Sequence, residues 1–373
     1  MNMKKKIICV IGTRPEAIKM APVIQTLVKE DWTDVKVLAT AQHRQMLDQV
    51  LDLFEITPDR DLNLMQPNQT LSALTAKLMT ELDQVFKEEK PDAVLAQGDT
   101  TTVMCVALSC FYHRIPFGHV EAGLRTGDIW NPFPEEMNRV VASRLAQWHF
   151  APTASSRDNL LREGIADSAV FVTGNTVIDA LLDIVKKTGP EVVPGIDASK
   201  RLVLVTSHRR ENFGQPFREI CRAILHLVAQ NEDIQVLYPV HPNPNVKDTA
   251  YELLGQHPRI RLCEPLEYLP FVSAMKNAYL ILSDSGGVQE EAPALAKPVL
   301  VLRSETERPE AVAEGVVKLV GTDFEKIVGE AQRLLDDASY YQSVARGVSP
   351  YGDGMASARI AKTLKDSLLT SCV

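Results

Sequence analysis

The sequence predicts an α/β protein built from two doubly wound halves with a cleft between them, each half a parallel sheet covered by helices on both faces. Its 373 residues exceed one ordinary core and, at about 150 residues per domain, indicate two domains. Short β-branched runs alternate with longer helical patterns, which is typical of a parallel sheet. A stretch rich in Gly and Pro over 175–200 interrupts this alternation once, and we expect it to connect the domains.

The apolar runs expected to form strands fall into two sets, one on each side of that connection. The first set is KIICVI (6–11), VKVLAT (35–40), DAVLAQ (92–97), IPFGHV (115–120) and WHFAP (148–152). The second set is RLVLVTS (201–207), IQVLYPV (234–240), IRLCEP (260–265), AYLILSD (278–284), KPVLVLR (297–303) and VVKLVG (316–321). Ligands of open α/β sheets bind outside the carboxyl ends of the strands, so polar residues just after these runs are the site candidates. An amphipathic helix is expected at 357–369.

The composition is that of an ordinary globular protein, with 45% hydrophobic residues, 24% charged residues and a net charge of −8. No basic block is present, which argues against a nucleic-acid partner because phosphate neutralisation needs clustered Lys and Arg. No apolar run reaches the roughly 18 residues of a membrane span, and the N-terminal run is too short for a signal peptide. The 6 cysteines are scattered without a C-x-x-C spacing, so we expect a reduced, cytoplasmic protein.

The segment GTRPEAIKMAP (12–22) follows the first expected strand and carries two cations. Pro15 suits the first helical position, so Arg14 is expected beside a helix N-terminus and Lys19 about one turn inside the helix. Backbone N–H groups and the helix dipole favour an anion there, and a guanidinium adds bidentate bonds to phosphate. The alternative is that both side chains are ordinary solvated cations.

Carboxylates gather at later strand ends and helix starts of the first half. Asp99 follows DAVLAQ and suits a helix N-cap, whereas Glu121, which follows IPFGHV, is not a preferred cap residue. Glu135 and Glu136 lie in the first turn of a helix, where the dipole alone would favour them. Each carboxylate has an ordinary structural explanation, but that explanation is less convincing for three of them after the strand ends of one domain.

In the second half, the segment VTSHRREN places a cationic cluster directly after a strand. His208, Arg209 and Arg210 together indicate an anion site with one titratable member. His241 follows another strand, but its proline-rich loop explains it equally well.

The segment SDSGGVQEEAP indicates a nucleotide site. Ser285, Gly286 and Gly287 stand at a helix start, where glycines let backbone N–H groups approach a phosphate closely. Glu290 and Glu291 follow about one turn later, and a glutamate there is placed to accept from ribose hydroxyls.

Motifs for a bound cofactor or metal are missing from the sequence. It has no G-x-G-x-x-G, no G-x-x-x-x-G-K-[ST], and no His, Cys and carboxylate spacing that suggests zinc. The triplet DRD at 59–61 matches the loose D-x-D pattern of metal-bound sugar nucleotides, but it is expected in a loop and so short a match arises easily by chance. We therefore expect neither a cofactor nor a metal.

Eight segments, in order along the chain, resemble the non-hydrolysing UDP-N-acetylglucosamine 2-epimerases of bacteria. They are GTRPEAIKMAP, AQHRQMLDQVL, QGDTTT, HVEAGLRTGD, NPFPEEMNR, VTSHRREN, SDSGGVQEEAP and ETERPEAV. The match extends from about residue 7 to the final helix. It departs at Ala41 and Ser207, where most relatives are expected to have glycine, and neither change removes a polar group.

The resemblance implies a GT-B-like architecture, with two Rossmann-like domains and a deep inter-domain cleft. It implies an N-terminal domain over 1–175 with the acid–base residues and a UDP-binding domain over 176–355. A C-terminal helix at 356–373 would return to the first domain, and the protein would be a homodimer.

The resemblance also implies reversible epimerisation at C2 between UDP-GlcNAc and UDP-ManNAc, which supplies ManNAc units for surface polysaccharides. UDP would leave C1 as the C2 proton is removed, giving 2-acetamidoglucal, and would then re-add. Catalytic positions of the family match Asp99, Glu121, Glu135, His208 and Lys19. Its substrate-binding positions match Arg14, Lys19, His208, Phe271 beside the uracil, Ser285, Gly286, Gly287, and Glu291 at the ribose. Which carboxylate is the base and which the acid stays open.

A second UDP-GlcNAc bound beside the active site, as an activator, is a further implication of the resemblance. The matching contact positions are Gln42, Gln45, Gln69, Glu135, Arg209 and His241, and all have the expected residue type.

Other functions remain open: a GT-B glycosyltransferase with a UDP-sugar donor, a hydrolysing epimerase that releases ManNAc and UDP, and a non-catalytic sugar-nucleotide sensor. The set Lys19, Asp99, Glu121 and Glu135 favours an epimerase, because a transferase usually needs one base in this half and an acceptor surface.

Overall fold

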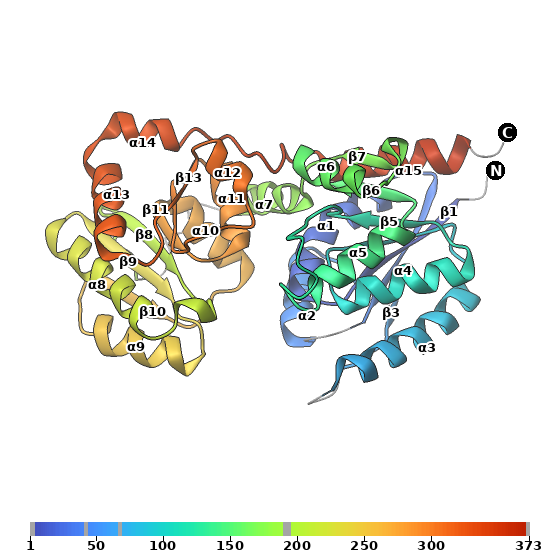
Figure 1. Ribbon diagram of the computed structural model, residues 1–373, viewed down its shortest axis with the longest axis horizontal. Coiled ribbons are helices and arrows are strands. Elements are labelled where there is room, and N and C mark those ends of the chain that lie inside the picture. Colours follow the sequence, from blue (N-terminus) through green and yellow to red (C-terminus); the bar gives the residue numbers. More distant parts are fainter. Residues whose placement is uncertain (1–3, 41–43, 66–68, 189–194, 371–373) are drawn as a thin grey trace. The chain divides into compact units, whose positions relative to one another are not determined.

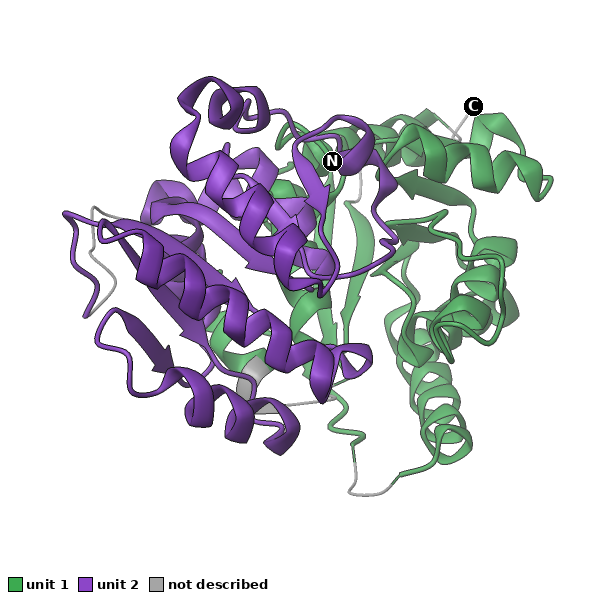
Figure 2. Ribbon diagram, turned by 60° about the vertical axis from the view of Figure 1, so that its left-hand side comes forward, with its two compact units in different colours: residues 1–180, 351–373 green, residues 181–350 purple. Residues whose placement is uncertain are grey.

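The computed structural model describes residues 4–40, 44–65, 69–188 and 195–370, with the side chains of 44–46 left out. The chain forms two compact units, coloured separately in Figure 2. The first unit combines residues 1–180 with 351–373, and the second is the continuous segment 181–350. The boundary falls within helix α7 (Thr176–Lys187).

The first unit is built on a parallel sheet whose seven described strands have the order β3-β2-β1-β4-β5-β6-β7. Figure 1 labels several of these strands and the helices around them. These strands are β1 (Lys5–Ile11), β2 (Thr33–Ala39), β3 (Arg60–Asp61), β4 (Ala93–Gln97), β5 (Phe117–Val120), β6 (Trp148–Ala151) and β7 (Val170–Val172). Strands β3 and β7 were not predicted from the sequence. The two residues of β3 are too few to show a strand pattern. Strand β7 lies in the run AVFV (169–172), which is as apolar as the runs that predicted the three-residue strands β12 and β13 of the second unit. The triplet at 59–61, expected in a loop, contains β3, and the Asp59 carboxylate accepts from the Val37 amide at 2.8 Å.

Helices cover both faces of this sheet. They are α1 (Arg14–Val28), α2 (Arg44–Leu53), α3 (Leu71–Glu89), α4 (Thr101–His113), α5 (Glu135–Leu145), α6 (Ala154–Arg162), the first turn of α7, and α15 (Ala356–Thr370), with a 3₁₀ turn at Asp167–Ala169. Leu78 and Leu82 of α3 and Val106 of α4 pack on Ile8 and Val10 of β1 in one buried cluster. The intervening residues of β1 are also buried, so this strand is apolar on both faces, as parallel strands between two helical layers require.

The second unit repeats the plan with a parallel sheet whose six described strands have the order β10-β9-β8-β11-β12-β13. Its strands are β8 (Arg201–Thr206), β9 (Ile234–Pro239), β10 (Ile260–Cys263), β11 (Ala278–Ser283), β12 (Val299–Val301) and β13 (Val317–Leu319). Its helices are α8 (Gln215–Gln230), α9 (Pro244–Leu254), α10 (Tyr268–Asn277), α11 (Gly286–Ala294), α12 (Pro309–Ala313), α13 (Phe324–Asp336) and α14 (Ala338–Val344), with a 3₁₀ turn at Arg210–Asn212. All six strands predicted for this half are present.

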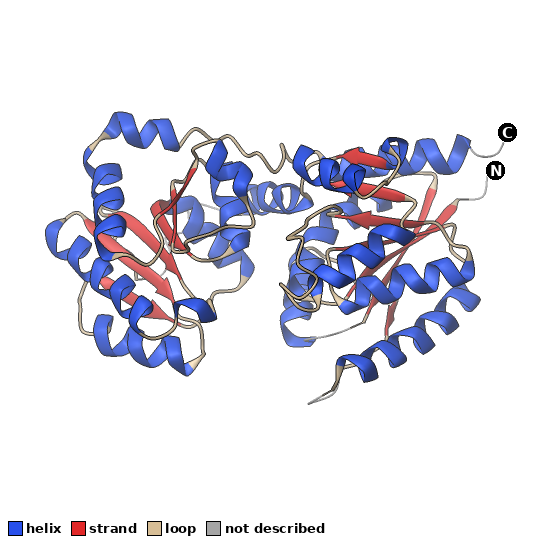
Figure 3. Cartoon of the chain, viewed as in Figure 1, coloured by secondary structure: helices blue, strands red, loops and turns tan. Residues whose placement is uncertain are grey.

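The two sheets share one topology, and Figure 3 shows strands with helices around them in each unit. From the third strand through the first to the sixth, the order in both is the doubly wound order of Rossmann folds. The α/β class and the two Rossmann-like halves are therefore confirmed. In such sheets the strand order reverses at a switch point, here between β1 and β4 and between β8 and β11, where ligands usually bind.

Helix α15 belongs to the first unit although it follows the whole second unit in sequence. The buried carboxylate of Asp179 holds its first turn, accepting from the Ser357 amide at 2.8 Å and from the Ser357 hydroxyl at 2.6 Å. Further along, Trp148 Nε1 donates to Ser367 Oγ at 3.1 Å. The helix also packs along α1.

Candidate active site

The turn after β1 is built around the buried carboxylate of Glu16. This carboxylate accepts from the Gly12 amide at 2.6 Å, the Thr13 amide at 2.7 Å and the Thr100 hydroxyl at 2.6 Å. Burial raises the pKa of Glu16, while these hydrogen bonds act in the opposite direction. A Cβ at Gly12 would lie 2.8 Å from Thr40 Oγ1, so the turn needs glycine. Glu16 therefore joins the turn after β1 to Thr100, which caps α4.

Helix α1 begins at Arg14, so Pro15 is its second residue and not its first as the sequence analysis predicted. The missing N–H still costs nothing, since the first turn of a helix has no intrahelical partners for its donors. Arg14 is half-buried, and its guanidinium makes no ion pair or hydrogen bond with the described residues. An unpaired guanidinium at a helix N-terminus suits an anionic ligand.

Glu121, directly after β5, is the most completely held of the predicted carboxylates in the first unit. Lys19 Nζ lies 2.7 Å from its Oε1 and 2.8 Å from its Oε2. Asn175 Nδ2 donates to Oε1 at 3.0 Å, and Gln97 Nε2 donates to Oε2. The side chain is only 4% exposed. Glu121 has φ of 65°, a left-handed conformation that costs a non-glycine residue about 1–2 kcal/mol. Such strain is typical of functional sites.

Asp99 follows β4 and is held more loosely than Glu121. Its Oδ2 lies 3.3 Å from Arg139 Nη2, and Asn138 Nδ2 donates to its backbone oxygen at 2.9 Å. Burial raises the pKa of Asp99; Arg139 and Lys19 oppose this, whereas Glu121 and Glu135 reinforce it. A carboxyl whose pKa is moved toward neutrality exchanges protons more readily near neutral pH.

The first turn of α5 separates its two glutamates into different environments. Glu136 is buried, and its carboxylate accepts from the Thr126 amide at 3.1 Å and the Gly127 amide at 3.2 Å, so it anchors the preceding loop. Glu135 is half-buried, and its carboxylate makes no hydrogen bond with the described residues. It lies one turn before Asn138 and Arg139, on the face of α5 that meets Asp99.

In the second unit, His208 is anchored by a residue that the sequence analysis passed over. His208 Nδ1 lies 3.1 Å from Oδ1 of Asp284, a fully buried residue just after β11. The Asp284 carboxylate also accepts from the His208 amide at 2.9 Å and the Arg209 amide at 3.0 Å. Burial raises the pKa of Asp284, but the bonds from His208 and these amides outweigh it and hold the pKa below the usual range.

His241, which follows β9, stacks on His208 with ring centroids 5.8 Å apart and an interplanar angle of 19°. Burial lowers the pKa of His241, and charge on His208 lowers it further, while Asp284 opposes both. Arg209, the neighbour of His208, is half-buried. The second unit therefore brings together three residues that the sequence analysis assigned to catalysis and to the activator site.

The start of α11 has the properties of a phosphate site. Its N-cap, Ser285, makes no side-chain capping bond, so the N-cap side chain does not occupy the first-turn N–H groups. An added Cβ at Gly286 would meet nothing within 4 Å, and one at Gly287 would make only ordinary contacts, the nearest at 3.8 Å to Ser285 Oγ. Neither glycine is therefore required by the packing of the described residues. A ligand that approaches the backbone closely explains both.

The buried Glu291 of α11 accepts from the Tyr268 hydroxyl at 2.7 Å. Tyr268 opens α10, and Phe271 lies one turn further on the same helix, where it is half-buried. The candidate ribose and uracil residues thus belong to neighbouring parts of the same unit.

Two side-chain contacts that were not predicted from the sequence join the segment ETERPEAV to α11. The Thr306 hydroxyl donates to Gln289 Oε1 at 2.6 Å, and Arg308 Nε pairs with the buried carboxylate of Glu290. These two contacts fix the loop before α12 against the helix whose N-terminus is the candidate phosphate site.

Other predicted residues can be placed only in part. Gln42 and the side chain of Gln45 lie outside the described residues, and Gln69 is half-buried just before α3. Among the residues that the structure describes, no cluster of His, Cys, Asp and Glu is arranged to hold a metal ion. None of the described helices combines the length and apolar character needed to cross a bilayer.

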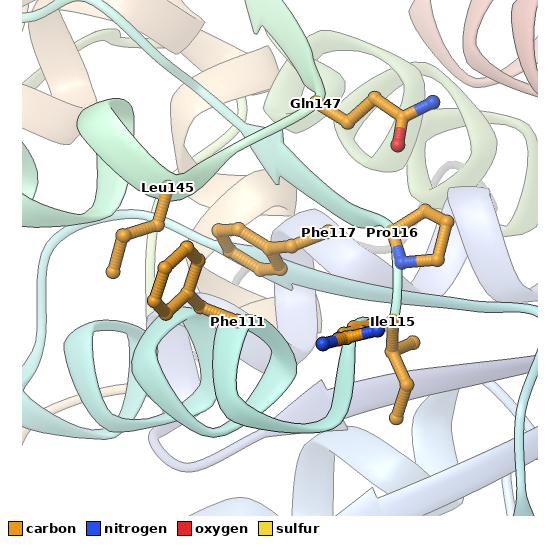
Figure 4. A pocket seen from close by; sticks show the side chains of 7 residues that line it. Phe111, Ile115, Pro116, Phe117, Leu145 and Gln147 are labelled. Carbon is orange, nitrogen blue, oxygen red and sulfur yellow. The ribbon is translucent and has the colours of Figure 1, made fainter.

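A cavity of about 300 Å³ lies in the first unit (Figure 4). It is lined by Phe111, Arg114, Ile115, Pro116, Phe117, Leu145 and Gln147. Phe117 begins β5, whereas Glu121 follows the other end of that strand. With no carboxylate in its lining, the cavity is not a candidate for the acid–base site.

The two units define a class of protein: a GT-B-like α/β protein with several carboxylates near the strand ends of one Rossmann-like half and, in the other, a helix N-terminus that is a candidate phosphate site. A family model described as UDP-N-acetylglucosamine 2-epimerase matches residues 25–365. The chain belongs to the UDP-N-acetylglucosamine 2-epimerase family.

Individual relatives agree with this assignment over nearly the whole chain. The chain is 53% identical over 374 residues to a UDP-N-acetylglucosamine 2-epimerase of Escherichia coli (strain K12), covering 98% of this chain and 100% of that protein. It is 50% identical to the UDP-GlcNAc 2-epimerase from Neisseria meningitidis, solved bound to UDP-GlcNAc, with a TM-score of 0.88 and coverage of 96% and 99%. The glycotransferase of kitacinnamycin shares only the fold, at 12% identity and a TM-score of 0.66, with 98% and 99% covered.

Lys19→Met is expected to destabilise the first unit by about 3–5 kcal/mol, because it leaves the buried Glu121 carboxylate without its cation. Combining it with Glu121→Gln should recover most of that loss. All three tryptophans lie in the first unit, so their fluorescence during urea unfolding reports on that unit alone. Lys36→Met, which breaks the exposed pair with Asp59, is the control and should cost less than about 1 kcal/mol. Additive effects of Lys19→Met and Glu121→Gln would contradict a buried pair.

Asp99→Asn is expected to abolish turnover while stabilising the first unit at neutral pH. Because folding raises the pKa of Asp99, the protonated form stabilises the folded state, and this contribution is lost as pH rises through the folded pKa. The side-chain amide of the variant resembles the protonated carboxyl but does not titrate. The variant therefore does not lose this contribution to folding stability as pH rises. Unfolding midpoints of wild type and variant should therefore differ at neutral pH and converge in acid, toward the ordinary Asp pKa of 3.8.

The control for this prediction is Asp92→Asn. Asp92 accepts from the Lys6 amide at 2.8 Å, so its replacement should lower stability and leave turnover unchanged. A lower stability of Asp99→Asn at neutral pH would contradict the proposed burial cost.

Proposed function

We propose that this protein is an isomerase that interconverts UDP-GlcNAc and UDP-ManNAc by eliminating UDP and adding it back, without hydrolysis. The observation that carries the proposal is the group of carboxylates at the strand ends of the first unit, with Glu121 paired to Lys19 and the pKa of Asp99 raised by burial. Inversion at C2 requires a proton to leave one face of that carbon and another to arrive on the opposite face, so at least two acid–base groups are needed.

The proposed acid–base groups differ in how many hydrogen bonds their carboxylates make. Asp99 and Glu135 are the candidates for moving the C2 proton, because neither carboxylate is saturated with hydrogen bonds from the described residues. Glu121 is already engaged by Lys19 and two side-chain amides, so it must give up at least one of these bonds in order to take a proton.

Departure of UDP places growing negative charge on the diphosphate, which preorganised donors stabilise best. We assign this task to Arg14 and His208, and to the N–H groups at Ser285, Gly286 and Gly287. The route needs no hydride carrier, in keeping with a sequence that lacks a dinucleotide fingerprint. Glu291 would bind the ribose and Phe271 would lie beside the uracil.

The proposal further includes a homodimer in the cytoplasm that supplies ManNAc units for surface polysaccharides. The homodimer and the pathway rest on the family resemblance. The cytoplasmic setting is supported by the free thiols of Cys9, Cys105, Cys110, Cys221 and Cys263.

Incubation with UDP-GlcNAc in D₂O should yield UDP-ManNAc with deuterium at C2, because the returning proton comes from solvent. NMR of the sugar follows the reaction. Release of free ManNAc would instead indicate a hydrolysing epimerase, and no change without an acceptor would indicate a glycosyltransferase. Glu121→Gln, which keeps the shape of the side chain, should lose most turnover and still bind UDP.

We further infer that a second UDP-GlcNAc activates the reverse reaction through Gln42, Gln45, Gln69, Glu135, Arg209 and His241. Stacking of His241 on His208 supports this inference. A ligand that binds at His241 would contact the residue that stacks on His208, which is a candidate catalytic residue. The rate with UDP-ManNAc should therefore rise when a trace of UDP-GlcNAc is added, whereas free GlcNAc should have no effect. A hyperbolic rate that UDP-GlcNAc leaves unchanged would refute activation.

A further inference from the structure

The contacts of Asp284 are unequally divided between its two carboxylate oxygens. Oδ2 accepts from Ser207 Oγ at 2.9 Å, the His208 amide at 2.9 Å, the Arg209 amide at 3.0 Å and Asn212 Nδ2 at 3.1 Å. Oδ1 lies 3.1 Å from His208 Nδ1 and 3.1 Å from the His208 amide. Oδ2 therefore holds the loop after β8, whereas Oδ1 is the only oxygen of the pair that meets the imidazole.

We propose that Asp284 is a positioning residue that holds His208 with its proton on Nδ1, so that Nε2 is the ring nitrogen presented to the ligand. An ionised carboxylate only accepts hydrogen bonds, so the nitrogen that faces Oδ1 must be the donor. The hydrogen bonds from His208 and the neighbouring amides, which outweigh the effect of burial, keep the pKa of Asp284 low, in keeping with an ionised group. His241 stacks on the ring with centroids 5.8 Å apart, and Arg209 and Arg210 follow His208 directly in the sequence.

This arrangement gives the two nitrogens of His208 separate tasks. Nδ1 is used for orientation, and Nε2 is left for the ligand. When the ring is protonated, Nε2–H can donate to an oxygen of the departing diphosphate while Asp284 balances the positive charge from the other side. This part of the inference rests on the proposed function, whereas the tautomer itself does not.

Asp284→Asn is the sharpest test, because the unequal contacts dictate how the amide must lie. Its oxygen should replace Oδ2, which serves four donors, and its NH₂ should replace Oδ1. The NH₂ would then donate to His208 Nδ1 and force the proton onto Nε2. Replacing the aspartate beside a catalytic histidine by asparagine can cost about 10⁴-fold in turnover through the wrong tautomer. We expect kcat to fall by at least about 100-fold, with UDP affinity within about threefold of wild type.

Ser207→Ala is the matched control, because it removes one donor to the same carboxylate and leaves the bond to His208 intact. It should retain kcat within about threefold, since a neutral hydrogen bond contributes only about 1 kcal/mol. Equal losses of kcat in the two variants would show that Asp284 acts only on the stability of the loop and would overturn the proposal.

The tautomer can also be measured in the wild-type protein, which keeps the test valid if Asp284→Asn does not fold. Nitrogen-15 NMR of the imidazoles, with the His208 signals assigned from their loss in His208→Gln, should show a protonated Nδ1 and an unprotonated Nε2 in the neutral ring. A neutral ring protonated at Nε2 would overturn the proposal. This measurement needs no substrate, so its failure is distinguishable from failure of the proposed epimerase activity.

Discussion

A parallel sheet can be connected only by crossovers that carry the chain from the end of one strand to the start of the next, and both units of this protein depend on that constraint. All strands of a sheet end at the same edge, so every loop that follows a strand emerges there. Where the strand order reverses, two of these loops leave in opposite directions and open a space between them. Arg14 and Asp99 come from the loops at the first reversal, and His208 and Asp284 from those at the second. The topology thus concentrates polar residues from distant parts of the sequence before any of their chemistry is considered.

Carboxylates at these edges divide into two kinds according to their hydrogen bonds. Glu16, Glu121 and Asp284 are buried and accept from several donors on different segments. An unpaired buried charge is very costly, so each of these groups forces the loops around it into one arrangement. Asp99 and Glu135 are only half-buried, and their carboxylates have few contacts or none with the part of the chain that the structure describes. We therefore expect the saturated groups to organise the candidate site and the unsaturated ones to remain able to exchange protons.

Local sequence patterns were sufficient to predict the sheets, because a strand buried on both faces is a continuous apolar run whatever surrounds it. The predictions failed for β3, which is too short to show a pattern, and for β7, although the apolar run AVFV (169–172) was an available signal. They also failed for the first residue of α1, which is Arg14 and not Pro15. In the candidate site, His208 was predicted from its position after a strand, but its partner Asp284, 76 residues away, was not. The available signal for Asp284 was its position as an acidic residue at the end of the buried apolar run 278–284.

Other hydrogen-bond partners were also not predicted, because they lie far along the sequence from the residue that they contact. Gln97 ends β4 and Asn175 precedes α7, so each is a polar residue beside an apolar segment, but neither position reveals that the two meet at Glu121. Asn175 and Glu121 are 54 residues apart in sequence. Such contacts depend on how separate strand ends converge, and a single sequence without the fold contains no measure of that convergence.

The return of α15 to the first unit has a consequence for how the protein is made. The first unit consists of two segments, and the second of these follows the whole of the other unit in the chain. On the ribosome, residues 181–350 can therefore reach their folded state while the first unit still lacks a helix along α1 and the serine amide and hydroxyl that satisfy Asp179. Domains are usually completed in the order of synthesis, but here the unit that starts first is the one that must be finished last.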